Sequence, residues 1–355
     1  MNMLDRYIAR TLLGAVALAM AVLLTLGLLF VFIGEQSDIG TGHYNVWAAF
    51  NYSLMTLPQF ALESFPAGAL IGAMLGIGVL ARSHELTVMR ASGMSKLRLC
   101  AAVLLSALLL VAIALLVEEF IAQPLAQMAD QDKAFARYSS VSFAGAQGAW
   151  IRSGDTIVEV QGLSTAADFS GMMVIQLTPD NRVASVARAS HATPLGPTAW
   201  RLFDYRESSL NQDSVDAEQQ PERVLRTTAS SDLLQFAVTE PAKLSLRTLY
   251  RAIVYLRGNN LQAGPYLIAF WSRIARLAGI VASLLFALPF GFGSMRSASL
   301  SSRTTLGLTL GIVYFFLQRL VESGAQVYRV DPLILAWVPT GLLGIAAVAL
   351  IWRVR

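Results

Sequence analysis

Residues 82–98 read RSHELTVMRASGMSKLR and form a short polar segment between two long apolar runs. The segment carries four basic residues and one acid, Glu85. Basic residues concentrate in the cytoplasmic loops of membrane proteins. The pattern therefore predicts a cytoplasmic loop that is held at both ends by membrane-spanning helices.

Helix signals inside this loop predict one short helix within residues 82–93. Ser83 stands just ahead of Glu85, where an N-cap is expected, and Gly93 followed by Ser95 has the form of a helix stop and a new helix start. A helix with one acid and apolar side chains is suited to docking on a partner protein. The alternative is a loop that serves only as a topology signal. The candidate docking residues are Arg82, Glu85, Leu86, Met89, Arg90 and Gly93.

The composition predicts an integral membrane protein. The 355-residue chain is 55% hydrophobic and only 14% charged, whereas soluble domains are about 25% charged. The net charge of +4 comes from Arg and Lys at the ends of apolar runs, so no nucleic-acid-binding face is expected. The single cysteine, Cys100, excludes an internal disulfide.

Six apolar runs have the length of membrane-spanning helices, which need about 20 residues. They lie near residues 11–34, 60–81, 99–117, 266–290, 304–321 and 332–352. The first run is too long for the apolar core of a signal peptide. Residues 35–56, which contain no Lys or Arg, are expected to form an outer loop. The segments assigned to the cytoplasm hold ten Lys or Arg and the two short outer loops hold one, so both termini are expected in the cytoplasm.

The middle of the chain is polar and has the pattern of a β domain. Short β-branched or alternating runs occur at residues 156–161, 172–177, 201–205 and 224–228. About 100 residues of such strands predict a sandwich or a jellyroll. The expected division of the chain is residues 1–136 for three spans and the loop helix, 137–240 for the β domain, and 241–355 for an amphipathic helix and three more spans.

Two spans carry additional helical features. Gly68, Gly72 and Gly76 form a stripe on one face of the second span, which lets another helix approach closely. That helix belongs either to the same chain or to a partner. The third span is expected to continue past Pro124 as a polar helix.

No motif supports an enzyme. The Walker A pattern is absent, and His84-Glu85 does not begin a zinc-protease motif because the second histidine position is Val88. The three histidines are scattered along the chain, so neither a metal site nor a cofactor is expected.

Charged residues within the spans are also few. Arg273 and Arg276 fall in the fourth span, and Arg319 and Glu322 fall near the end of the fifth at a spacing that allows them to pair. Ion-coupled carriers usually place ionisable residues in mid-span. Energy supplied by a cytoplasmic partner is therefore the favoured interpretation.

Several stretches together carry a family resemblance. They are LDRYIARTLL (4–13), FPAGALIGAMLGIGVLARSHELTVMRASGMS (65–95), QPLAQMADQDKAFARY (123–138), NLQAGPYLIAFWSRI (260–274) and FALPFGFGSMRS (286–297). They resemble the LptF/LptG family of lipopolysaccharide-export permeases nearly end to end. The resemblance implies an α-helical inner-membrane protein with six transmembrane helices and a periplasmic β-jellyroll domain between helices 3 and 4.

The resemblance also implies a set of partners. The chain would pair with an LptF-like permease subunit and dock on an LptB-like ATPase dimer, which hydrolyses ATP. The complex would extract lipopolysaccharide from the membrane and pass it to an LptC-like membrane protein and an LptA-like periplasmic bridge. The loop helix would be the coupling helix, with Glu85 at the family's acidic coupling position.

Lipid contacts are expected at the first and fifth spans, between which the resemblance places lateral lipid entry. Acyl chains would pass aromatic side chains there, for which ordinary helix packing is the alternative. Some family members carry lysines near the outer end of the first span, whereas this chain has Glu35 and Asp38. Lys133 and Arg137 are the remaining basic candidates, with a solvated helix face paired to Asp130 as the alternative. The candidate lipid-binding residues are Phe30, Phe32, Lys133, Arg137, Phe315, Phe316 and Arg319.

Two other functions fit parts of the pattern. An inner-membrane scaffold that displays a periplasmic β domain would explain the topology but not the docking-type loop. A lipoprotein extractor of the ABC class would explain the loop, but such permeases typically have four spans.

Overall fold

The computed structural model describes most of the chain, and its contacts divide the chain into two units. The described residues are 3–137, 149–153, 155–160, 171–178, 182–195, 199–210, 215–226, 241–258, 262–291, 300–324 and 331–353. The helical unit consists of Met1–Lys133 and Ser245–Arg355, and the sheet unit consists of Ala134–Leu244. Each unit is described by itself.

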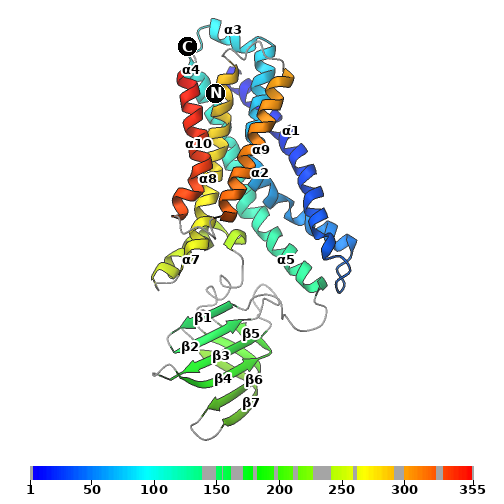
Figure 1. The fold of residues 1–355 in the computed structure, drawn as a ribbon, viewed down its shortest axis with the longest axis vertical. Helices are drawn as coiled ribbons and strands as arrows, with labels where there is room; N and C mark the ends of the chain where they lie inside the picture. The colour runs from blue at the N-terminus through cyan, green and yellow to red at the C-terminus, as the bar shows by residue number, and fades with distance from the viewer. Residues whose placement is uncertain are drawn as a thin grey trace. The chain divides into compact units, whose positions relative to one another are not determined.

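Long helices build the helical unit (Figure 1). They are α1 (Met3–Gly34), α2 (Val46–Arg82), α4 (Lys96–Val117), α8 (Gly264–Ala287), α9 (Leu300–Gly324) and α10 (Pro332–Arg353), joined by the shorter α3 (Glu85–Ala91), α5 (Gln123–Arg137) and α7 (Leu246–Gly258). Within the described residues, five helices are long and apolar enough to cross a membrane, and α9 has a shorter apolar run, Thr305–Val321. Six crossings therefore stay a prediction.

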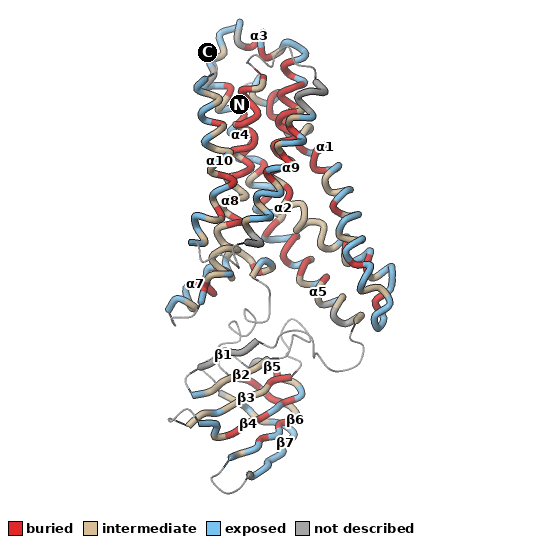
Figure 2. The backbone as a smooth tube through the Cα atoms, in the orientation of Figure 1, coloured by how far each residue is buried: buried red, intermediate tan, exposed pale blue. Residues whose placement is uncertain are grey.

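Helix α2 is the central helix of this unit. Its most apolar window is 83% buried, against 22% for α1 and for α10, and Figure 2 shows the same concentration of buried residues along it. Residues 46–56, which were expected to belong to a loop, form the first turns of α2, which begins at Val46. The Asn45 side chain accepts a hydrogen bond from the backbone N–H of Ala48 and so caps the helix.

The glycine stripe of α2 packs against α1 of the same chain, which decides between the two alternatives stated above. A methyl group added at Gly68 would meet Met20, one at Gly72 would meet the Val16 backbone, and one at Gly76 would meet Leu12 and Ala15. The absence of side chains therefore lets the two helix backbones approach closely.

A methyl group at Gly72 is expected to destabilise the helical unit. Its nearest neighbour is backbone, which cannot rotate away, so Gly72→Ala should cost about 1–3 kcal/mol through overpacking. The measurement is thermal unfolding of the purified protein in detergent. Gly14→Ala on α1 is the matched control, because its added methyl meets no atom within 4 Å. Equal stability of the two variants would contradict this packing.

Helix α8 is fastened to its neighbours by buried hydroxyl groups. The Ser283 hydroxyl donates to the Pro66 carbonyl of α2 at 2.9 Å, and the Thr340 hydroxyl of α10 donates to the Ala275 carbonyl at 3.0 Å. The Tyr314 hydroxyl of α9 lies 3.0 Å from the same Thr340 oxygen. These bonds satisfy polar groups of side chains that are buried between the helices.

The third predicted span continues into a polar helix, as expected. One π-helical turn, Glu118–Ala122, joins α4 to α5, and Pro124 falls in the first turn of α5. A proline has no N–H to donate, so it interrupts the backbone hydrogen bonds of a continuing helix, and it stands here next to a turn whose hydrogen-bond pattern is already irregular.

The described strands of the sheet unit form a single antiparallel sheet. The strands are β1 (Ala149–Ser153), β2 (Thr156–Val160), β3 (Met172–Leu177), β4 (Val183–Ala189), β5 (His191–Pro194), β6 (Ala199–Leu210) and β7 (Val215–Arg226). Strand β6 pairs with β4 and β5 along one edge and with β7 along the other. Strands β1, β4 and β5 were not predicted, and the jellyroll stays a prediction.

Candidate functional site

The loop between α2 and α4 contains the predicted short helix, α3. Gly93 has φ +91° and Ser95 accepts a hydrogen bond from the N–H of Arg98, so the predicted stop and the predicted new start are both confirmed. The prediction of Ser83 as the N-cap of α3 was wrong. Its hydroxyl donates to carbonyls at the end of α2, and His84, at φ +59°, makes the turn between the helices. Figure 1 shows α3 at the same end of the helical unit as both chain termini.

Helix α3 has an inner and an outer face. Leu86 and Met89, two of the predicted docking residues, are buried in the main hydrophobic core and attach α3 to the helical unit. Val88 is 65% exposed, and Thr87 and Ala91 are exposed beside it. Val88 was not among the predicted residues, although its position between two buried apolar residues was a signal that it faces outward.

Glu85 connects α3 to α1. The Tyr7 hydroxyl forms a hydrogen bond with the Glu85 carboxylate. The Oε2 atom of Glu85 is buried and has no hydrogen-bond partner among the described residues. A buried carboxylate oxygen without a donor is costly, so a donor from outside the described residues is expected to satisfy it. Arg82 is exposed at the end of α2, and the side chain of Arg90 is not described.

The predicted acyl-chain residues fall into two groups. Phe30 on α1 is 70% exposed and Phe316 on α9 is 65% exposed, so both are free to contact lipid. Phe32 packs edge-on against Phe50, and Phe315 packs edge-on against the ring of Phe60. Phe32 and Phe315 therefore take part in packing within the chain, where they attach α1 and α9 to α2.

The predicted basic residues are already paired or partly buried. The Arg319 guanidinium lies 3.1 Å from the carboxylate of Glu63 on α2, and the Glu322 side chain lies outside the described part. Arg137 is half-buried at the end of α5. Lys133 forms ion pairs with Glu35 and Asp38 rather than with Asp130.

A buried ion pair joins α8 to the π-helical turn. The Nε atom of Arg273 lies 3.2 Å from Oε1 of Glu118, and the two side chains are 2% and 9% exposed. Glu118 directly follows the third predicted span, which ends at Val117. The wider π-helical turn was not predicted, and π-helical turns are frequent at functional sites.

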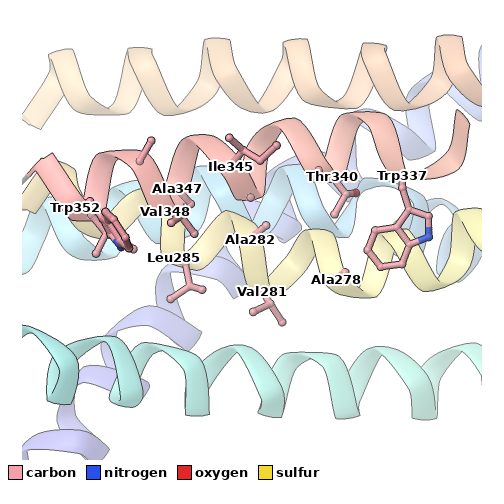
Figure 3. A pocket seen from close by; sticks show the side chains of 14 residues that line it. Ala278, Val281, Ala282, Leu285, Trp337, Thr340, Ile345, Ala347, Val348 and Trp352 are labelled. Carbon is pink, nitrogen blue, oxygen red and sulfur yellow. The ribbon is translucent and has the colours of Figure 1, made fainter. Parts of the chain in front are cut away.

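An apolar cavity of about 790 Å³ opens between α8 and α10 (Figure 3). Trp337 and Trp352 mark its two ends, and Val281 and Leu285 form part of its wall. No charged residue is among the described residues that line it. Its chemistry suits a hydrocarbon chain and offers no contact to a headgroup. Elsewhere, the described residues contain no group of His, Cys, Asp and Glu able to hold a metal ion.

A set of long apolar helices, with a sheet inserted in the chain between α5 and α7 and a short helix between α2 and α4, fits the class of multi-helix membrane permeases. The sequence profile described as "Lipopolysaccharide export system permease LptF/LptG" matches residues 6–353. The chain therefore belongs to the LptF/LptG family.

Characterised relatives narrow the resemblance to the LptG type. The chain is 29% identical to the lipopolysaccharide export system permease protein LptG of Escherichia coli K12, over 99% of this chain and 98% of that protein. It is 25% identical to LptG of Haemophilus influenzae, over 99% and 97%. The several apolar helices fit an inner-membrane protein of this kind.

Proposed function

We propose that this chain is the LptG-type permease subunit of an ABC transporter that extracts lipopolysaccharide from the inner membrane and passes it to a periplasmic bridge. The observation that carries the proposal is the family match over residues 6–353. In this assignment the chain pairs with an LptF-like subunit and carries no catalytic step. ATP is hydrolysed by an LptB-like dimer.

The outer face of α3 is the proposed contact with the ATPase. Val88 supplies exposed apolar surface at the centre of this face, and Arg82 lies just before the helix. Leu86 and Met89 hold α3 against the core, so a displacement of α3 is transmitted to α2 and α4. The α3 end and both termini are then cytoplasmic, which agrees with the excess of basic residues in those segments.

The proposed lipid path uses the exposed aromatic residues of α1 and α9. Phe30 and Phe316 contact acyl chains that enter between α1 of one subunit and α9 of the other. Arg319, Lys133 and Arg137 are the proposed headgroup contacts. The lipid then leaves through the β domain toward an LptC-like membrane protein and an LptA-like bridge.

Depletion of the chain is the direct test. Lipopolysaccharide should accumulate at the inner membrane when the chain is depleted, as measured by fractionation of the two membranes. A scaffold that only displays a β domain would leave lipopolysaccharide distribution unchanged.

ATP turnover should depend on a partner. The sequence contains no Walker A loop, so the purified chain alone is expected to neither bind nor hydrolyse ATP. Coexpression with the ATPase subunit should yield a complex that hydrolyses it. A catalytically inactive ATPase variant in the same complex is the control. ATP turnover by this polypeptide alone, free of contaminants, would contradict the assignment.

A further inference from the structure

Lys133 on α5 is bound between two carboxylates from the turn that follows α1. Its Nζ atom lies 2.6 Å from Oε2 of Glu35 and 2.9 Å from Oδ2 of Asp38. The three side chains are 19%, 11% and 22% exposed. Two acids at the end of α1 therefore hold one base on α5, in a setting that is largely shielded from water.

Two tyrosines enclose this contact. The Tyr44 hydroxyl donates to Oε2 of Glu35 at 2.8 Å, and Tyr44 is only 1% exposed. The Nζ atom of Lys133 lies 4.7 Å from the centre of the Tyr52 ring and 5.8 Å from that of Tyr44, within the range of cation–π attraction. The five residues, here called the lysine cluster, thus join the turn after α1, the start of α2, and α5.

The charges in the lysine cluster favour the paired state. Burial lowers the pKa of Lys133, but hydrogen bonds and charge from Glu35 and Asp38 outweigh that effect, and the pKa is raised. Burial, followed by the bond to Glu35, raises the pKa of Tyr44, which therefore remains a neutral donor. Lys133 is protonated, and its charge is already balanced by two carboxylates.

We propose that the lysine cluster is a latch that fastens the outer end of α1 to α5, and that the anionic headgroup of the cargo lipid opens it. The headgroup exchanges for the two carboxylates at Lys133. This inference rests on the proposed function, which supplies the phosphate-bearing lipid.

Opening follows from the chemistry of the exchange. A lysine ammonium has three donors, and a phosphate presents several acceptor oxygens to them. Once Lys133 turns to the phosphate, Glu35 and Asp38 lose the cation that they share, and the repulsion between their like charges is no longer offset by it. The turn that carries them moves away from α5 and takes the end of α1 with it.

The latch makes a counterintuitive prediction about affinity. The headgroup binds Lys133 only when the carboxylates have left. The apparent affinity for lipopolysaccharide is therefore the affinity of the open state multiplied by the fraction of molecules that are open. The double variant Glu35→Gln with Asp38→Asn should therefore bind lipopolysaccharide more tightly, by about tenfold, the equivalent of one charge-assisted hydrogen bond. Lys133→Gln should bind it more weakly.

The experiment uses the complete complex in nanodiscs of phosphatidylcholine with and without lipopolysaccharide. Spin labels at Ser37→Cys and Met128→Cys, in a Cys100→Ser background, report the distance between the end of α1 and α5. The expected result is a short distance without lipopolysaccharide, a longer one with it, and the longer one at all times in the Gln/Asn variant. Inorganic phosphate alone should leave the short distance unchanged.

Matched controls keep the outcomes separate. Asp132→Asn removes one negative charge from an exposed position of the same helix and should change neither distance nor affinity. Unchanged or weaker affinity of the Gln/Asn variant, while the wild-type complex transports lipopolysaccharide, overturns the latch and leaves the proposed function standing. A wild-type complex that does not bind lipopolysaccharide overturns both.

Discussion

Replacing Arg273 by leucine is expected to destabilise the helical unit by about 3–5 kcal/mol, the cost of leaving a buried charge without its partner. Its guanidinium pairs with Glu118 at 3.2 Å, and both side chains are buried. Removal of the guanidinium leaves the Glu118 carboxylate without its partner in a low-dielectric interior. Chemical unfolding in detergent, with tryptophan fluorescence as the signal, measures the loss.

A double-variant cycle separates the pair from general packing damage. Arg273→Leu together with Glu118→Leu should recover most of the lost stability, because apolar residues of similar size often replace a buried ion pair at little cost. Arg319→Leu is the comparison, since its ion pair with Glu63 is 60% exposed on the arginine side and should be worth less than about 1 kcal/mol. A double variant as unstable as Arg273→Leu alone would show that the charge is not the cause.

Glu85→Lys is expected to leave the chain folded and inserted but to uncouple lipid export from ATP hydrolysis. Loss of a paired interfacial charge typically costs about 2–5 kcal/mol, which weakens docking tens-fold to thousands-fold. The structural role of the carboxylate near the start of α3 is smaller, about 0.3–1 kcal/mol through the helix dipole. Lipopolysaccharide release and ATP hydrolysis, measured together in proteoliposomes of the complex, test the prediction.

The hydrogen bond between Tyr7 and Glu85 provides the control. Tyr7→Phe removes the hydroxyl and leaves the charge of Glu85 in place, so transport should continue. An acid introduced on the facing surface of the ATPase should partly restore Glu85→Lys. Full lipopolysaccharide transport by Glu85→Lys would mean that residues 82–98 act only as a topology signal.

Local signals in the sequence predicted the elements that depend on neighbouring residues. Gly93 and Ser95 mark the end of one helix and the start of the next, because capping is decided within a few positions. The early start of α2 was missed because polar residues and Pro58 interrupt the apolar pattern of residues 46–59, although Asn45 was an available cap. Tertiary packing overrides such local preferences.

Ion pairs between residues that are far apart in the chain could not be predicted from the sequence. Lys133 has Asp130 nearby in the chain, yet it pairs with acids about 100 positions away. Arg273 and Glu118 are farther apart still in the sequence, and no local pattern in either segment predicts that they pair. The chemistry of each charged residue was readable, but its partner depends on how α1, α5 and α8 are placed.

Helix α2 runs for 37 residues without a break, from beside Tyr44 to the threshold of α3. At 1.5 Å per residue its path is about 55 Å long, nearly twice the thickness of a bilayer's hydrocarbon core. Pro58 and Pro66 lie inside it, and a proline in a helix interior removes a backbone hydrogen bond and bends the helix. The two prolines separate the first turns of α2, which carry Tyr52, from the glycine stripe and the end that leads to α3. A movement of α3 therefore has to pass both prolines before it reaches Tyr52, and they are the positions at which this long helix can flex.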